Sequence, residues 1–340
     1  MTDFVEFHPD SIRNDTDSKT LSRQVMMKTK DTDLVILLSA ICTACKLTAR
    51  SVRKAGIAGL YGTAGSENCT GDAQKKLDVL SNDMFVNSLY NSHVCCVLVS
   101  EENEEAIIVS EDRAGKFCVA FDPLDGSSNI DCNVSTGTIF SVWKKESQGP
   151  ATVADILRPG SEMVCAGYCA YGSATELVVS YGHGVERFTL DPSIGEFILT
   201  AERMVLPDVQ KTIYSVNEGN YLTWDAPMRQ VVDDFKQHKP QPYTARYVGS
   251  MVSDVHRTLM YGGIYLYPAD AAKGNGKLRI LYEGFPMAKI MEDAGGEASS
   301  GPFRGEIRRI LDIVPRSIHD KCPVLIGSGR DVQRVLAYYK

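Results

Sequence analysis

The chain has 340 residues, of which 44% are hydrophobic and 23% are charged, and its formal net charge is −7. This composition is typical of a globular protein, and the acidic balance argues against a nucleic-acid-binding surface. No apolar run approaches the roughly 18 residues of a membrane span, and the first residues do not resemble a signal peptide, so we expect a cytoplasmic protein with no nucleic-acid or membrane partner.

The length favours two subdomains, because a single hydrophobic core stops growing near about 250 to 300 residues. We place the boundaries so that an arm over 1–30 precedes an N-terminal subdomain over 31–200 and a C-terminal subdomain over 201–340. Ten cysteines without a signal peptide indicate reduced thiols. The adjacent Cys95 and Cys96 should point to opposite faces of a strand.

The N-terminal third predicts two helices and a loop. Residues 1–30 are polar with mixed charge and indicate a loose arm. Apolar residues recur at helical spacing over 32–56 and predict a long helix. The stretch 59–71 is too rich in glycine for a regular element, so it predicts a mobile active-site loop that leads through Asp72 into a helix over 75–89.

The rest of the chain alternates between short strand-like runs and helical patterns, which predicts a layered α/β architecture. The predicted strands are 94–99, 107–109, 117–121, 136–143, 164–171, 176–180, 213–216 and 277–282. The predicted helices are 228–238, 253–259 and 287–294, and 191–195 reads as a turn.

The stretch that suggests chemistry is 121–129, Phe-Asp-Pro-Leu-Asp-Gly-Ser-Ser-Asn, which follows the apolar run 117–121. We interpret it as a turn at the carboxyl end of a buried strand, which would place Asp122 and Asp125 on that turn. Gly126 lets the backbone approach a ligand, and the serines after it offer donors at a helix start. An ordinary surface turn would explain either the Asp-Pro or the Asp-Gly dipeptide alone. Together, the carboxylates can bind a cation beside amide and hydroxyl donors that can bind an anion, and this combination suits a magnesium-dependent phosphatase.

Further carboxylates stand where other predicted elements begin or end. Each has a surface explanation, since a Glu-Glu pair is commonly solvated and an aspartate commonly caps a helix. Gathered in one cleft they would repel one another unless cations lay between them. The sequence also lacks a phosphate-binding Gly-rich loop, a His-Glu-x-x-His motif and a serine elbow. The additional acids are Asp72, Asp78, Glu101, Glu102 and Glu283.

These motifs resemble a known group of enzymes. The run 122–128, with Glu101 and Glu102 before it and Glu283 and 293–296 after it, resembles the magnesium-dependent, lithium-sensitive phosphomonoesterases. Within that group, the resemblance is to the fructose-1,6-bisphosphatases, and it extends from about residue 32 to the end. The phrases that carry it are 76–83, 172–175, 191–199, 217–219, 245–251, 254–258 and 276–279.

The resemblance implies a fold and a reaction. The fold would be an α-β-α-β-α sandwich of the sugar phosphatase type, with an allosteric-type subdomain over 31–200 that carries most metal ligands and a substrate-binding subdomain over 201–340. The reaction would be hydrolysis of the 1-phosphate of fructose 1,6-bisphosphate to fructose 6-phosphate and inorganic phosphate by metal-activated water, in gluconeogenesis. The family also implies a homotetramer in which an arginine equivalent to Arg246 crosses from a neighbouring subunit.

The resemblance also implies roles for individual residues. Two or three Mg²⁺ ions per subunit, with Mn²⁺ or Zn²⁺ as substitutes, would be held by Asp72, Glu101, Asp122, the Leu124 carbonyl, Asp125 and Glu283. Asp78 and Glu102 would be catalytic, since they would orient or deprotonate the attacking water. The substrate would be bound by Asp125, Gly126, Ser127, Ser128, Asn217, Arg246, Tyr247, Gly249, Ser250, Met251, Tyr267, Lys277, Leu278 and Arg279. Residues 125–128 would bind the 1-phosphate. The basic and tyrosyl residues, together with Asn217, would bind the 6-phosphate.

The matching positions for AMP differ from those of the AMP-inhibited family members. In those enzymes the nucleotide phosphate lies at the start of the first long helix, on a small, Thr-containing segment. Here this start carries Asp31 and Asp33, and carboxylates at a helix N-terminus repel a phosphate. We therefore expect weak or absent inhibition by AMP.

Two alternatives remain open. Within the same class, the chain could be a sedoheptulose-1,7-bisphosphatase or an inositol-type phosphatase, although Lys277 and Arg246 favour a sugar bisphosphate. From another class, it could be a catalytically silent sugar-phosphate sensor or scaffold, although the acidic set is complete.

Overall fold

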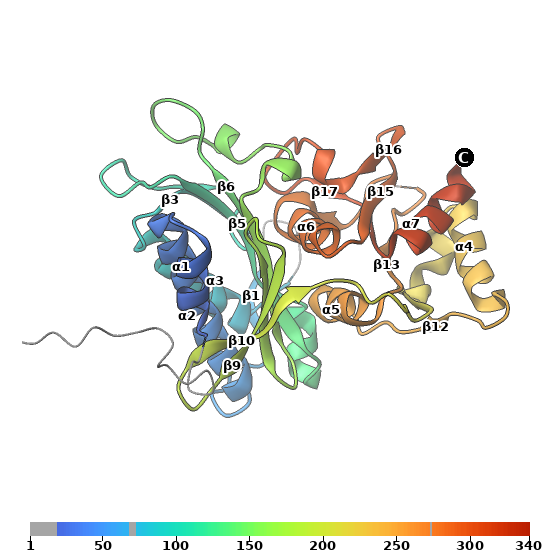
Figure 1. The fold of residues 1–340 in the computed structure, drawn as a ribbon, viewed down its shortest axis with the longest axis horizontal. Coiled ribbons are helices and arrows are strands. Elements are labelled where there is room, and N and C mark those ends of the chain that lie inside the picture. The colour runs from blue at the N-terminus through green and yellow to red at the C-terminus, as the bar shows by residue number, and fades with distance from the viewer. Residues whose placement is uncertain (1–18, 68–72, 273) are drawn as a thin grey trace, which may run out of the picture.

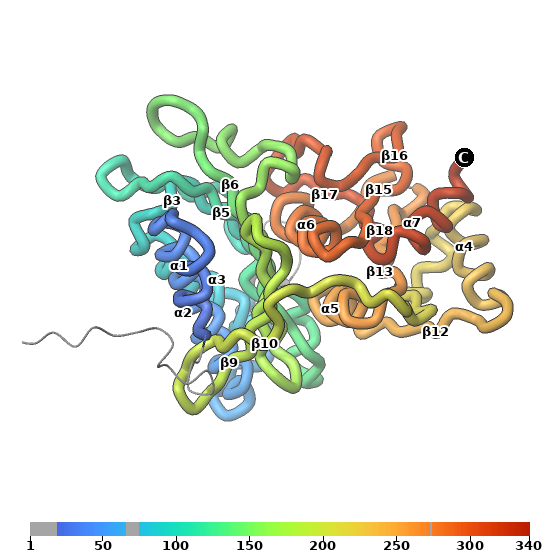
Figure 2. The backbone as a smooth tube through the Cα atoms, viewed as in Figure 1, coloured from blue at the N-terminus to red at the C-terminus, as the bar shows by residue number. Residues whose placement is uncertain are grey.

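The computed structural model describes residues 19–67, 73–272 and 274–340 (Figures 1 and 2). An eight-stranded sheet with the order β10-β9-β8-β7-β6-β5-β3-β4 forms the N-terminal half. Its neighbouring strands are antiparallel except β3 and β5, which run parallel, so their carboxyl ends meet at one edge. The strands are β3 (Cys95–Ser100), β4 (Ile107–Ile108), β5 (Phe117–Asp125), β6 (Thr136–Lys144), β7 (Cys165–Tyr171), β8 (Thr175–Ser180), β9 (Val185–Asp191) and β10 (Glu196–Met204).

A six-stranded sheet with the order β12-β11-β13-β18-β15-β16 forms the C-terminal half, and two small antiparallel pairs accompany the sheets. The six strands are β11 (Ile213–Ser215), β12 (Thr244–Ala245), β13 (Ile264–Tyr267), β15 (Glu297–Phe303), β16 (Glu306–Arg309) and β18 (Val324–Gly327). The pairs are β1 (Thr63–Glu67) with β2 (Ala73–Lys75), and β14 (Leu278–Arg279) with β17 (Lys321–Cys322).

The helices and the sheets form five layers, α-β-α-β-α (Figure 1). One helical layer covers the outer face of the eight-stranded sheet, a second lies between the sheets, and a third covers the outer face of the six-stranded sheet. The first layer is α1 (Leu21–Lys28), α2 (Thr32–Lys54) and α3 (Lys76–Tyr90), the second is α5 (Met251–Tyr261) and α6 (Phe285–Asp293), and the third is α4 (Ala226–Gln237) and α7 (Gly329–Leu336). This arrangement confirms the predicted sandwich.

The eight-stranded sheet is buried on both faces because its side chains alternate between two apolar layers. In β7, Cys165 and Cys169 face the outer helices, whereas Ala166 and Tyr168 face the layer between the sheets. Cys95 and Cys96 divide in the same way, as predicted from their adjacency.

The helix α2 corrects one expectation about apolar length. The helix has 23 residues, and its most apolar stretch of 18 residues has a mean hydropathy of 1.6, so it is long and apolar enough to cross a membrane. Half of that stretch is buried inside the fold. Leu37, Leu38 and Ile41 are fully buried in the core shared with α3 and the sheet. The apolar stripe therefore serves as the core face of the helix. Asp31 caps its start by accepting a hydrogen bond from the Leu34 amide at 3.3 Å.

The expectation of a loose arm over 1–30 is wrong where the structure describes it. Residues 21–28 form α1, and its Gln24 and Lys28 side chains donate to the buried Glu186 carboxylate of β9 at 2.8 and 2.5 Å. A β-bridge between Thr20 and Ile198 fixes the entry to this helix. The polar residues of this segment form a helix that packs on the sheet, because the buried Glu186 carboxylate accepts their hydrogen bonds.

Two other local predictions are wrong. The described part of the Gly-rich stretch, 59–67, is not irregular throughout, because it contains the strand β1, although Thr63 of that strand lines the cavity at the carboxyl end of β5 as an active-site segment would; residues 68–71 lie outside the described residues. The next helix begins at Lys76 with Lys75 as its cap. The predicted strand over 277–282 is only the two-residue β14, because the chain turns into the π-helical turn Ile280–Gly284. The Ser141 hydroxyl donates to the Leu281 carbonyl at 2.6 Å and holds that turn against β6.

Candidate active site

A cavity of about 530 Å³, the active cavity, lies at the carboxyl ends of β3 and β5 and takes lining residues from both sheets. Most of the residues predicted for the site line it. They are Asp78, Glu101, Glu102, Asp122, Leu124, Asp125, Gly126, Ser127, Ser128, Asn217, Tyr247, Gly249, Met251, Tyr267, Lys277, Leu278, Arg279 and Glu283. Segments as far apart in the chain as Asp78 and Glu283 thus meet in one hollow.

Among the predicted site residues that the structure describes, Arg246 and Ser250 do not line this cavity. Arg246 is exposed, and its guanidinium donates to the Ala245 carbonyl at 2.9 Å. Ser250 is fully buried and packs against Gly126. Asp72, predicted as a metal ligand, lies outside the described residues.

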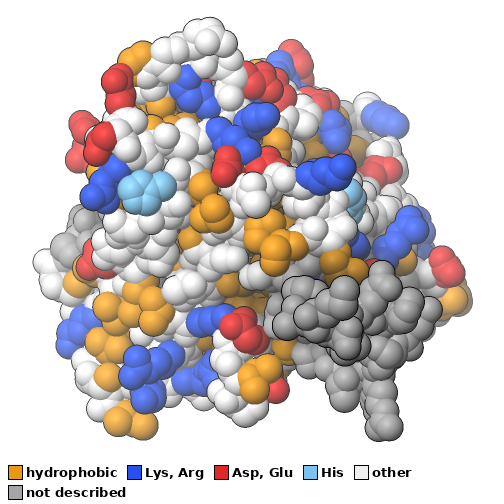
Figure 3. All heavy atoms as spheres, turned by 60° about the vertical axis from the view of Figure 1, so that its left-hand side comes forward, with side chains coloured by type: hydrophobic (Ala, Val, Ile, Leu, Met, Phe, Trp, Pro, Cys, Tyr) orange, Lys and Arg blue, Asp and Glu red, His pale blue; other side chains and the backbone are white. Residues whose placement is uncertain are grey.

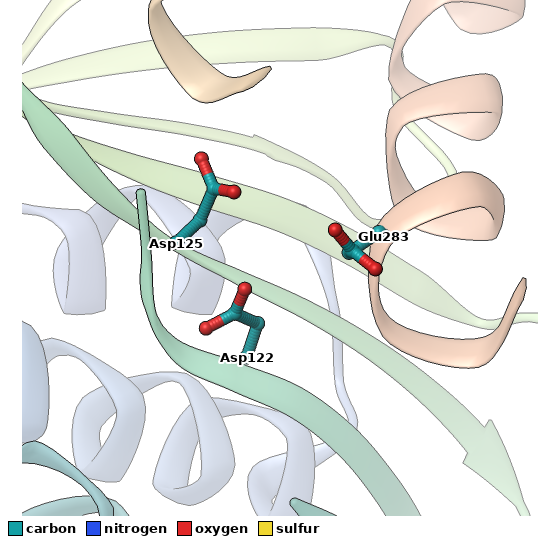
Figure 4. A group of neighbouring side chains, drawn as sticks. All are labelled: Asp122, Asp125 and Glu283. Carbon is teal, nitrogen blue, oxygen red and sulfur yellow. The ribbon is translucent and has the colours of Figure 1, made fainter. Parts of the chain in front are cut away.

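Three carboxylates form the acidic cluster in the wall of the cavity. One oxygen from each of Asp122, Asp125 and Glu283 lies within 4.8 Å of the others. Figure 4 shows the three side chains converging from β5 and from the helical turn that carries Glu283. Oxygen atoms at this spacing are the donor set of a hard divalent cation.

The two aspartates lie in a strand rather than on a turn. Strand β5 continues to Asp125, and its pairing with β6 is irregular between Asp122 and Asp125. The Leu124 amide donates to Asp122 Oδ1 at 2.9 Å within this irregular stretch. The residue after the strand, Gly126, has a φ of 75°, which belongs to the left-handed region that favours glycine. The proline and glycine that predicted a turn instead mark a bulged strand end.

Burial and mutual repulsion raise the pKa values of the cluster. The pKa of Asp122 lies well above its usual value, because the side chain is buried and Glu101 and Asp125 are nearby. Burial raises the pKa of Asp125 to about 7 and that of Glu283 to about 8. So many carboxylates can all be ionised at neutral pH only if cations balance them. The residues present therefore fit a divalent metal ion.

Arg279 supplies part of the balancing charge. Its guanidinium lies 2.7 Å from Glu101 and 3.7 Å from Glu283, and its amide donates to Glu283 Oε2 at 2.6 Å. These contacts fix both glutamates relative to β14. The Arg279 side chain is 7% exposed, so water screens the ion pair poorly.

Asp78 is a second kind of carboxylate. It stands in the first turn of α3, accepts a hydrogen bond from the Lys75 amide at 2.7 Å and lines the cavity. Burial raises its pKa to about 6, against the opposing effect of the Lys75 hydrogen bond. A carboxylate with a pKa near 6 accepts a proton at neutral pH better than an ordinary aspartate does.

The turn that carries Glu101 and Glu102 is held by residues that the sequence did not single out. The Ser100 hydroxyl accepts from the Glu102 amide at 3.2 Å and donates to Asn82 Oδ1 at 2.7 Å. The Asn82 amide donates in turn to Asn103 at 2.9 Å. Helix α3 therefore positions both glutamates at the end of β3.

The loop 246–250 on the opposite wall is organised by Asp254, which was also missed. Asp254 is fully buried in the first turn of α5, and its carboxylate accepts hydrogen bonds from the amides of Val248 and Gly249 at 3.1 Å. The Val252 amide, also on α5, donates to Asp125 at 3.2 Å. One helix start thus holds both a wall of the cavity and a member of the acidic cluster. Aspartates are common in the first turn of helices, so the sequence did not indicate that Asp254 holds the loop 246–250.

The sequence matches known proteins over nearly its whole length. The model of the N-terminal domain of fructose-1-6-bisphosphatase matches residues 18–202, and that of the C-terminal domain matches 207–340. The cytosolic fructose-1,6-bisphosphatase of Brassica napus is 55% identical over 309 residues, which cover 90% of this chain and 89% of the relative. That of Oryza coarctata is 52% identical over 331 residues, with 95% and 94% covered.

A solved structure agrees with these relatives. The crystal structure of Leishmania major fructose-1,6-bisphosphatase in holo form is 45% identical and superposes with a TM-score of 0.90, covering 95% of this chain and 99% of that one. The fold, the acidic cavity and the similarity over both halves lead to the same assignment. The chain belongs to the fructose-1,6-bisphosphatase family of phosphoric monoester hydrolases.

Proposed function

We propose that this protein hydrolyses the 1-phosphate of fructose 1,6-bisphosphate to fructose 6-phosphate and inorganic phosphate, in cytosolic gluconeogenesis. The convergence of Asp122, Asp125 and Glu283 in one cavity is the observation that carries the proposal. The cytosolic location follows the names of the plant relatives. Within the chain, 31–200 supplies most of the acidic wall and 201–340 most of the wall that would face the sugar.

The metal ions would be held by the acidic wall. The family is metal-dependent, and we propose two or three Mg²⁺ ions, which Mn²⁺ or Zn²⁺ could replace. Bound Mg²⁺ would neutralise the phosphate charge and lower the pKa of the attacking water. The proposed ligands are the acidic cluster with Glu101, the Leu124 carbonyl and Asp72.

The chain's own residues would position the reacting groups. Asp78 has the pKa of a base at neutral pH, and with Glu102 it would orient the water and take its proton. The 1-phosphate would lie against Gly126, Ser127 and Ser128, where the backbone enters a short 3₁₀ helix, because the first amides of a helix lack acceptors within it.

The far wall of the cavity suits the second phosphate. Lys277 supplies a positive charge, and Asn217, Tyr247 and Tyr267 supply neutral polar groups around it. Arg246 is exposed and is not among the residues that line its own cavity, which supports the proposal that it completes a neighbouring site in a homotetramer.

We expect phosphate release from fructose 1,6-bisphosphate that requires Mg²⁺ and is faster than release from sedoheptulose 1,7-bisphosphate or an inositol monophosphate. A preference for either of the other substrates would instead favour the same-class alternatives. Absence of release from all three with Mg²⁺ present would favour the silent sensor or scaffold.

The variant Lys277→Met should raise KM for fructose 1,6-bisphosphate by about tenfold to a hundredfold with little change in kcat, because a charge-assisted contact with the non-reacting phosphate is made equally in the ground and transition states. Steady-state phosphate release measures both constants. Lys321→Met is the matched control, since Lys321 lines a neighbouring cavity with Lys277 but not the active cavity. An unchanged KM in Lys277→Met would contradict the assigned pocket.

AMP should inhibit this enzyme weakly or not at all. Lys116 lies 2.6 Å from Asp31 and 2.9 Å from Asp33, so the cation at the start of α2 is already paired with carboxylates that repel phosphate. An inhibition curve with AMP at saturating Mg²⁺ tests this. Half-maximal inhibition at low micromolar AMP would refute the prediction.

A further inference from the structure

His319 connects the two halves of the molecule through both nitrogens of its ring. It lies just before β17, and its Nδ1 atom is 2.8 Å from the hydroxyl of Tyr282, the residue before Glu283. On the other side of the ring, Nε2 is 3.0 Å from the Asn103 carbonyl and 3.3 Å from the Glu104 carbonyl. One imidazole thus joins the turn after β3 to the helical turn that carries Glu283.

The chemistry of these contacts assigns a direction to each hydrogen bond. A carbonyl only accepts, so we assign the ring proton to Nε2, which donates to the turn after β3. In the neutral ring Nδ1 is then an acceptor, and the Tyr282 hydroxyl donates to it. Burial lowers the pKa of His319, in keeping with a neutral ring. Both nitrogens are therefore used, one as a donor and one as an acceptor.

The main chain around His319 is fixed to the C-terminal half. The Ile280 amide donates to the Asp320 carbonyl at 2.7 Å, and β17 pairs with β14 directly after it. The Asp320 carboxylate lies 2.6 Å from the Arg304 guanidinium and accepts from the Arg316 amide at 2.8 Å. The imidazole therefore extends from a well-anchored segment toward the other half.

The hydrogen bond to Tyr282 is shielded from water. Lys and Arg side chains are interspersed with Asp and Glu over the face seen in Figure 3, and exposed charge pairs contribute little because water and salt screen them. Tyr282 is instead fully buried, so a loss of His319 would deprive a buried hydroxyl of this acceptor. Breaking the bridge is therefore costly, which suits a contact that fixes geometry.

The bridge supports the active cavity from outside it. Neither His319 nor its partners Tyr282, Asn103 and Glu104 line the cavity, so His319 would touch neither substrate nor metal ion. The side chain of Asn103 accepts from Asn82 of α3, whereas its carbonyl accepts from His319. The turn after β3 is thus held from both halves of the molecule.

We propose that His319 is a positioning residue that holds the turn of Glu101 and Glu102 against the turn of Glu283, so that carboxylates from both halves meet around the metal ions. The inference rests on the proposed metal-dependent function. Arg279 pairs with the side chains of two of these glutamates, whereas His319 fixes the backbone from which the first pair extends. Residues that orient metal ligands in this way commonly change metal affinity or activity by about tenfold to a hundredfold.

The test compares Mn²⁺ binding to the full-length wild type and to His319→Phe, which keeps an aromatic ring and removes both hydrogen bonds. The paramagnetic resonance signal of free Mn²⁺ reports binding without substrate. His319→Phe should weaken Mn²⁺ binding by at least about tenfold and raise the Mg²⁺ concentration for half-maximal phosphate release by a similar factor. The KM for fructose 1,6-bisphosphate at saturating Mg²⁺ should stay unchanged, because other residues face the sugar and its second phosphate.

A conservative variant and a matched control separate positioning from general stability. His319→Gln should recover most of the Mn²⁺ affinity, since an amide carries a donor and an acceptor as the neutral imidazole does. His256 is the control, because its Nδ1 atom also lies 2.8 Å from a buried hydroxyl, that of Tyr168, and neither residue lines the active cavity. His256→Phe should lower the melting temperature in EDTA, as His319→Phe does, but leave Mn²⁺ affinity unchanged.

Unchanged Mn²⁺ affinity in His319→Phe would overturn the proposal. Equal losses in His319→Phe and His256→Phe would also overturn it, because they would make the effect one of general destabilisation. A loss in His319→Gln as large as that in His319→Phe would show that the two hydrogen bonds are not what matters. If the wild type binds Mn²⁺ but releases no phosphate, the proposed function fails, and the Mn²⁺ affinities still decide the role of His319.

Discussion

The variant Asp122→Asn is expected to lose at least about a hundredfold in phosphate release while keeping its fold. Asparagine has the same shape, and its amide oxygen still accepts the hydrogen bond from the Leu124 amide. The charge that helps to hold a cation is lost, whereas the repulsion by Glu101 and Asp125 is relieved. The metal-free variant should therefore melt at a higher temperature than the metal-free wild type, although it is inactive.

Circular dichroism and thermal melting in EDTA and in Mg²⁺ would separate these effects. The wild type should gain melting temperature when Mg²⁺ is added, and the variant should gain much less. Asp208→Asn is the matched control, since Asp208 is exposed and has no partner among the described residues. Full activity in Asp122→Asn, or a lower melting temperature in EDTA than that of the wild type, would contradict the proposed metal site.

The stability of the metal-free protein should fall as the pH rises from about 4.5 to about 8. The pKa of Asp78 is raised to about 6, that of Asp125 to about 7 and that of Glu283 to about 8, so the folded state holds protons that the unfolded state has already lost. Folded-state pKa values above the unfolded ones give stability at low pH that disappears as these groups ionise. Melting temperatures in EDTA across this range measure the slope.

Mg²⁺ should reverse this trend, because the ion takes the place of those protons. Its affinity should rise by about tenfold per pH unit for each proton that binding displaces. The gain in melting temperature on adding Mg²⁺ should therefore be larger at about pH 8 than at about pH 5, and proton release on binding should be detectable in weak buffer. In EDTA, the variant Glu283→Gln should show a smaller fall in melting temperature between about pH 7 and pH 8 than the wild type. Parallel curves of melting temperature against pH with and without Mg²⁺ would contradict the linkage between proton release and Mg²⁺ binding.

The strands of the larger sheet could be predicted because their apolar runs are long and bounded by turn residues. Strands β5 to β8 lie within a few residues of the predicted ranges. The glycines and small polar residues of 59–71 have no apolar period, so nothing local indicated that β1 pairs with β2. The run 277–282 is short and apolar, a pattern that strands and buried helical turns share, and tertiary packing on β6 decided for the turn.

The acids of the site could be found in the sequence because carboxylates at the ends of buried strands are unusual in number. Their supporting residues could not, since Asn82 and Asp254 resemble ordinary polar residues of helices until their partners are known. Whether Arg246 lines the cavity depends on the path of its loop in three dimensions. Local sequence patterns therefore identified the acidic residues, whereas the residues that position them could be recognised only in the three-dimensional structure.

The active cavity has one wall at the end of β5, which carries Asp122, and another on β13, which carries Tyr267. Each wall belongs to a half of the molecule with its own sheet, so a rigid-body rotation could widen or narrow the gap without melting either half. A displacement of about 1 Å between reacting groups is enough to slow catalysis by about a hundredfold. A ligand or contact far from the active cavity that altered the angle between the halves would therefore slow turnover, even without touching any residue of that cavity.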